Sequence, residues 1–102
     1  NAYIRCRLIV TEENPPLRPY KQNAWADLPD ASSAEVELSL ALLRALHARW
    51  VRFWEQLPDD AWPREGAHPE YGQMSLDRLL RTYAGHGEAH LDQIRRTLAA
   101  GR

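Results

Sequence analysis

The sequence predicts an all-α protein built around two long amphipathic helices. Apolar residues recur at intervals of three and four positions in residues 36–57 and again in residues 76–98. This is the period of a helix with one buried face. Proline and glycine concentrate in residues 12–31 and 58–74, where they interrupt regular structure. A chain of 102 residues has room for one domain rather than two.

The N-terminal third of the chain is a short apolar piece followed by a connection. Residues 1–11 place apolar side chains at mixed spacing. A strand is compatible with their β-propensity, but we favour the end of a helix, on the family resemblance given below. Residues 12–31 contain four prolines, so regular structure is not expected there. Leu17, Tyr20, Trp25 and Leu28 should pack this connection onto the surface of the fold.

Two serines mark the predicted starts of the long helices. Ser32 and Glu35 fit a capping box, in which each side chain satisfies a free backbone amide near the other. The first long helix should therefore begin at Ser32 and end before Pro58. Ser75 can cap the second long helix, and Gly101 is suited to end it.

These elements do not suffice for a complete bundle. Two helices and a short N-terminal piece cannot enclose a four-helix core, so another protomer or more chain before Asn1 is expected to complete it. The chain opens at Asn1 without an initiator methionine, which is consistent with part of a longer protein.

Composition excludes several classes of partner. The formal net charge of −1 gives no reason to expect nucleic acid or an anionic membrane as a partner. No apolar run approaches the ~20 residues that span a bilayer. Cys6 is the single cysteine, so an internal disulfide is excluded and a reducing, cytoplasmic location is expected.

Two histidines are the strongest candidates for chemistry. His86 and His90 are four residues apart, so their side chains project from one face of the second long helix, within its apolar arc. Two neutral imidazoles at this spacing can reach one divalent metal ion at ~2.0–2.1 Å. The alternatives are a pair of core histidines that hydrogen-bond within the protein and a pair at this spacing by chance.

The residues around this pair exclude one mechanism. The zinc-protease motif H-E-x-x-H requires a glutamate general base directly after the first histidine. Here Gly87 follows His86, and Glu88 lies off the ligand face. Gly85 and Gly87 flank His86, which indicates close approach of another helix, room for a ligand, or a mobile helix. No general base is identified from the sequence.

The remaining histidines and the cysteine receive structural interpretations. His47 lies on the core-facing stripe of the first long helix. We expect it to orient a metal ligand or to bond to a loop, with direct ligation as the alternative. His68 should be exposed or packed within its loop. Cys6 should be a buried structural thiol.

The sequence resembles the YfiT-like branch of the DinB superfamily. Residues 8–31, LIVTEENPPLRPYKQNAWADLPDA, look like the long connection between the second and third helices of that branch. The resemblance extends over almost the whole chain in the same order and spacing. The further matching segments are residues 39–40, 46–50, 68–70 with Gly72, 75–76 and YAGHGEAH at 83–90.

The resemblance implies a DinB/YfiT-type four-helix bundle, usually dimeric. This chain would cover the end of helix 2 plus helices 3 and 4, so residues 1–102 would be the C-terminal part of a single DinB-like domain. The resemblance also implies a nickel or zinc ion held by three histidines, two of which match His86 and His90. The third belongs to helix 2 and is expected upstream of Asn1.

The resemblance further implies a metal-dependent enzyme with a small-molecule substrate. The family is described as metal-dependent hydrolases, and related branches are thiol transferases that use low-molecular-weight thiols such as bacillithiol. A hydrolase and a thiol S-transferase both remain open, and a non-catalytic bundle for binding or dimerisation is the alternative. Gly85, Ala89 and Gln93 stand where the family often has tryptophan or histidine, which alters the surroundings of the pair but not the pair itself.

Overall fold

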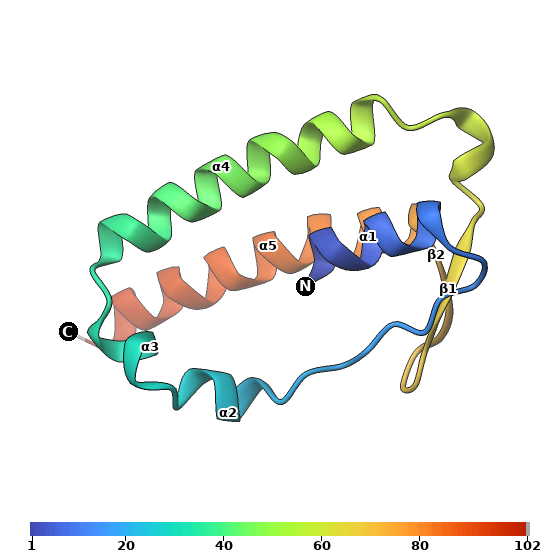
Figure 1. Ribbon diagram of the computed structural model, residues 1–102. Helices are drawn as coiled ribbons and strands as arrows, with labels where there is room; N and C mark the ends of the chain where they lie inside the picture. The colour runs from blue at the N-terminus through green and yellow to red at the C-terminus, as the bar shows by residue number, and fades with distance from the viewer. Residues whose placement is uncertain (102) are drawn as a thin grey trace.

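The computed structural model describes residues 1–101 and is mostly helical (Figure 1), which confirms the all-α prediction. Residues 1–11 form a helix rather than a strand, as expected. The elements in chain order are α1 (Ala2–Thr11), α2 (Gln22–Ala26), α3 (Pro29–Ser33), α4 (Val36–Glu55), the 3-10 turn η1 (Asp59–Ala61), β1 (Glu65–His68), β2 (Gly72–Ser75) and α5 (Leu76–Ala100).

The core lies where α1, the β1–β2 hairpin and the first half of α5 meet. Cys6 and Ile9 of α1 pack there with Leu76 and Leu79 of α5, and all four are at most 1% exposed. Leu17 reaches the same cluster from the connection after α1. Burial of these apolar side chains is the main force that holds the three elements together.

Helix α4 joins this core through aromatic side chains near its C-terminal end. Trp50 lies 5.5 Å from Tyr83 of α5, measured between ring centroids. Trp54 stacks on Trp62 at 5.5 Å with an interplanar angle of 16°. The N-terminal half of α4 is exposed along its apolar face, as at Leu38 and Leu42.

The predicted capping box at Ser32 is wrong. Helix α4 begins at Val36, and its N-cap residue Glu35 makes no side-chain cap hydrogen bond. Ser33 instead ends α3, where its hydroxyl donates to the carbonyl oxygen of Pro29 at 2.8 Å. Pro29 stands in the first turn of α3, and its fixed φ favours a helix start there, ahead of the serines.

The connections contain more regular structure than expected. The proline-rich residues 12–31 include α2 and the start of α3. Residues 58–74 hold most of the antiparallel β1–β2 hairpin, with Glu65 opposite Ser75 and His68 opposite Gly72. The prediction that residues 12–31 lack regular structure was therefore wrong, and the hairpin within the second connection was not predicted.

The hairpin is extended by the chain that leaves α1. The Leu17 amide donates to the Ala67 carbonyl at 2.8 Å, and the Ala67 amide donates to the Pro15 carbonyl at 2.9 Å. Leu17 packs against Gly66, where a Cβ atom would lie 2.8 Å from the leucine side chain. Only glycine leaves room for this contact, so Gly66 fixes how the connection docks.

At the start of α5 the serine cap is confirmed. The Ser75 hydroxyl accepts a hydrogen bond from the Arg78 amide at 3.1 Å, as an N-cap serine should. At the other end Gly101 is the C-cap residue, and its amide donates to the carbonyl of Thr97. Within residues 1–101, the helices lack the combination of length and apolarity that crossing a membrane requires.

Candidate metal centre

Helix α5 brings His86 and His90 together. The helix runs unbroken through both residues, so one turn separates them along a single face. Their Nε2 atoms lie 2.8 Å apart, and their ring centroids are 4.3 Å apart at an interplanar angle of 84°. The rings therefore converge on a common point.

Gln93 fixes which nitrogen of His90 is free. The Nδ1 atom of His90 lies 2.9 Å from Oε1 of Gln93, and an amide oxygen can only accept, so Nδ1–H is the donor. The proton of the neutral ring is thus on Nδ1, and Nε2 presents a lone pair. His86 Nε2–H donates into that lone pair. The ring edge that a metal would bind is therefore the one directed at the partner histidine.

The geometry of the pair fits two ligands of one metal ion. Two nitrogens at ~2.0–2.1 Å from a tetrahedral ion are about 3.3 Å apart, and the separation falls to about 2.9 Å at a right-angled pair of ligands. The Nε2 atoms are 2.8 Å apart, so both could bind one ion once the proton of His86 moves from Nε2 to Nδ1. Among residues 1–101, no group of three or more histidine, cysteine, aspartate or glutamate side chains could hold a metal. The described chain thus offers two candidate ligands.

The expectation that the pair lies on a buried face was wrong. His86 and His90 are exposed, and Leu91 and Ile94 beyond them are 47% and 57% exposed. The reason is that α1 and β2, the elements that contact α5 most closely, pack near its first residues, where its buried side chains lie. Gly85 also faces open space, since a Cβ atom added there would meet nothing within 4 Å. No close helix approach therefore exists at Gly85 in residues 1–101.

A cavity of about 790 Å³ extends from the hairpin to His86. Its wall runs along α5 from Arg78 through Tyr83 to His86, and eight helical residues correspond to about 12 Å. The connection after α1 also lines it, through residues such as Tyr20 and Lys21. A small molecule in this cavity would lie beside the histidine pair.

His68 occupies the hairpin end of that cavity. It is 7% exposed, and its Nδ1 accepts hydrogen bonds from the amides of Glu70 at 3.1 Å and Tyr71 at 3.3 Å. Of the two expected alternatives, an exposed His68 and a His68 packed within its loop, the structure shows the second. Its place in the cavity was not foreseen. The signal was present in the sequence, because Pro69 has no amide and leaves the next two amides free to reach His68.

Within the described chain, neither His47 nor Cys6 is hydrogen-bonded to the histidine pair. His47 lies on α4, with its ring 6.3 Å from that of Trp50, and within residues 1–101 no hydrogen bond joins it to His86 or His90. Burial raises the pKa of the Cys6 thiol from 9.0 to about 11, and the Trp50 side chain opposes this shift. Cys6 is therefore a neutral buried thiol at pH 7, as expected, and not a nucleophile.

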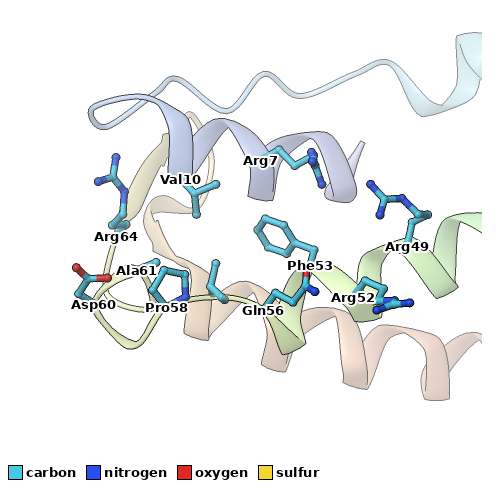
Figure 2. A pocket seen from close by; sticks show the side chains of 11 residues that line it. Arg7, Val10, Arg49, Arg52, Phe53, Gln56, Pro58, Asp60, Ala61 and Arg64 are labelled. Carbon is cyan, nitrogen blue, oxygen red and sulfur yellow. The ribbon is translucent and has the colours of Figure 1, made fainter.

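A second cavity of about 400 Å³ opens between α1, α4 and the chain that follows α4 (Figure 2). Figure 2 shows Phe53 between the two helices, with the arginines Arg7 and Arg49 facing each other above it. This cavity is lined by neither histidine nor cysteine, and Asp60 is its single acidic residue within the described chain. The histidine pair on α5 therefore remains the candidate for metal chemistry in residues 1–101.

The fold and the site define a helical bundle with a pair of histidines one turn apart on its last helix. Comparison with known protein families assigns the chain to a family of this class. The DinB superfamily model matches residues 2–94, and the chain belongs to the DinB superfamily.

Similar proteins share most of this chain. A protein of Oceanobacillus iheyensis named "Putative metal-dependent hydrolase" is 43% identical over 94 residues, which is 92% of this chain and 54% of that protein. A Bacillus cereus protein of the same name is 41% identical over 101 residues, which is 96% of this chain and 58% of that protein.

A solved structure matches the fold. YfiT from Bacillus subtilis, described as a probable metal-dependent hydrolase with an unusual four-helix bundle topology, aligns with a TM-score of 0.86 and 37% identity. The alignment covers 97% of this chain and 59% of YfiT. The predicted bundle type is therefore confirmed, and the chain spans between 54% and 59% of the length of these relatives.

Proposed function

We propose that His86 and His90 hold a divalent metal ion in a metal-dependent enzyme that acts on a small molecule. The observation that carries this proposal is the pair of Nε2 atoms 2.8 Å apart, with the His90 proton placed on Nδ1 by Gln93. Relatives at about 40% identity whose names include metal-dependent hydrolase support it.

The proposed ion is zinc or nickel, with a third histidine supplied from a segment that precedes Asn1. Imidazole nitrogens suit both metals, and three protein ligands leave positions open, as in catalytic rather than structural sites. When bound, the ion would activate a water molecule or a thiol as the nucleophile. His86 and His90 hold it, Gln93 orients His90, and the cavity beside His86 receives the substrate.

Both a hydrolase and a low-molecular-weight-thiol S-transferase remain within this proposal. We favour the hydrolase, because the relatives carry that name. The cavity of about 790 Å³ is of the size that takes a small molecule. We also propose that residues 1–102 are the C-terminal part of one DinB-like domain in a cytoplasmic homodimer. The exposed apolar side chains of α4 and α5 support additional packing partners.

The metal content of the full-length protein tests the proposal. We expect purified wild-type protein to contain one zinc or nickel ion per chain by mass spectrometry of the metals, and His86→Ala to lose most of it, because one of few ligands is removed. His47→Ala is the matched control, since His47 lies on α4 and outside the histidine pair, and it should keep its metal. Equal metal content in wild type and His86→Ala would contradict the proposal and favour a non-catalytic bundle.

A further inference from the structure

His68 is held in a single tautomer by the backbone. Its Nδ1 accepts from two amides, those of Glu70 and Tyr71, at 3.1 and 3.3 Å. A nitrogen that accepts two hydrogen bonds carries no proton, so the proton of the neutral ring is on Nε2. The Tyr71 ring lies 4.7 Å from that of His68 and restricts its rotation. His68 is therefore a hydrogen-bond donor of fixed position.

The donor has no partner within the described chain. No hydrogen bond to Nε2 of His68 occurs in residues 1–101, although the residue is only 7% exposed. The Nε2 atom is not among the partnerless polar atoms that are sealed from solvent in that part of the chain. Since His68 lines the cavity that reaches His86, this nitrogen can meet a ligand there.

The surroundings of His68 are basic. Arg5, Lys21 and Arg78 line the same cavity, against one acidic residue, Glu70. None of these four forms an ion pair within residues 1–101, where the two ion pairs lie elsewhere on α5. Arg78 donates to the carbonyls of Tyr71 and Gln73, which places its guanidinium at the hairpin turn that follows His68. Its charge is not neutralised by these carbonyls.

We propose that His68 Nε2–H and the guanidinium of Arg78 bind an anionic group of the molecule that enters the cavity. This group is a carboxylate or a phosphate. This inference rests on the proposed function for the identity of that molecule as a substrate. A neutral N–H donor beside uncompensated cations favours an anionic acceptor over a neutral one. His68 is thus a residue that selects and positions the ligand.

The cavity also sets the length of such a ligand. Arg78 and His86 are eight residues apart on α5, which is about 12 Å. An anion bound at the hairpin end would place the other end of an extended small molecule beside the histidine pair. A ligand that reached both ends of the cavity would be an elongated small acid whose reactive group is remote from its charge.

Anion binding to the metal-free protein tests this inference. Histidine proton–nitrogen correlation spectra of EDTA-treated protein should show His68 protonated on Nε2. Inorganic phosphate and acetate, titrated separately against sodium chloride at equal ionic strength, should shift that resonance to saturation. The two anions distinguish a phosphate from a carboxylate preference. Because metal is removed, the result does not depend on whether His86 and His90 bind an ion.

Two substitutions separate the roles of the two ring nitrogens. His68→Asn keeps an acceptor near the Nδ1 position and loses the Nε2 donor, so the fold should persist while the affinity for the preferred anion falls about tenfold. His68→Gln keeps a donor near the Nε2 position and loses the local acceptor, so it should bind the anion but melt at a lower temperature. His47→Asn, the same change outside the cavity, should leave anion binding unchanged.

Three results would overturn the proposal: a His68 proton on Nδ1, no saturable shift with either anion, or wild-type affinity in a folded His68→Asn protein. If anion binding fails while His86→Ala still loses metal, the proposed function stands and this inference alone is rejected. If metal binding fails while the anion titration succeeds, the cavity is a binding site independent of metal.

Discussion

The two halves of α5 are built by different forces. Near its start, Leu76 and Leu79 are buried against α1 and the hairpin, whereas His86 and His90, on either side of its midpoint, are exposed. Apolar contact fixes the first half. Polar contact, through the His86–His90–Gln93 hydrogen bonds, organises the second. One helix therefore carries core residues at its start and the proposed metal ligands further along.

The largest difference in stability between the two halves of α5 should appear when a leucine in each half is replaced by alanine. Leu79→Ala removes a side chain that is 1% exposed, so we expect a loss of about 2–5 kcal/mol in the free energy of unfolding. Leu91→Ala, at a position 47% exposed, should cost less than about 1 kcal/mol. Urea denaturation followed by circular dichroism measures both. Similar losses at the two sites would mean that the second half of α5 is covered in solution.

Two glycine-to-alanine substitutions should change the free energy of unfolding in opposite directions. Gly66→Ala places a Cβ 2.8 Å from the Leu17 side chain, and this overpacking should cost about 1–3 kcal/mol. Gly85→Ala meets nothing within 4 Å and replaces a poor helix former, so it should stabilise by up to about 1 kcal/mol. Thermal unfolding of the two variants checks the prediction. A destabilised Gly85→Ala protein would show that the space beside His86 is occupied.

The smallest expected effect on stability is at Gln93. Gln93→Leu removes the acceptor for His90 Nδ1, so the affinity for zinc should fall about tenfold while the free energy of unfolding changes by less than about 0.5 kcal/mol. Gln93→Glu retains an acceptor and should bind zinc at least as well as the wild type. Calorimetric zinc titration of each variant measures the difference. Wild-type affinity in Gln93→Leu would show that Gln93 does not orient His90.

The sequence predicted most of the helical structure because its signals are local. The apolar period located α4 and α5 to within a few residues of their observed bounds, and Ser75 marked the start of α5. At Ser32 two local signals competed, the capping box and the proline of α3, and the proline prevailed. Spacing alone brought His86 and His90 together, since one helical turn fixes their relation.

Local sequence signals do not predict the hairpin or the exposure of the histidine pair. The strands of the hairpin, E-G-A-H and G-Q-M-S, lack the β-branched and aromatic residues that favour strands. They are held by Leu17, which docks from a distant part of the chain. Similarly, a periodic pattern identifies the apolar face of α5 but not the element that covers it. Long-range contacts decide both features.

The hydrogen bond between Leu17 and Ala67 has a consequence for the order of folding. It joins residues 50 positions apart in the chain, so α2, α3 and α4 must be enclosed as a loop before it can form. Loop closure over that span carries an entropic cost, whereas α5 and the hairpin need only neighbouring residues. We therefore expect α5 and the hairpin to assemble early, and the arrival of Leu17 at Gly66 to be the late step that completes the native state.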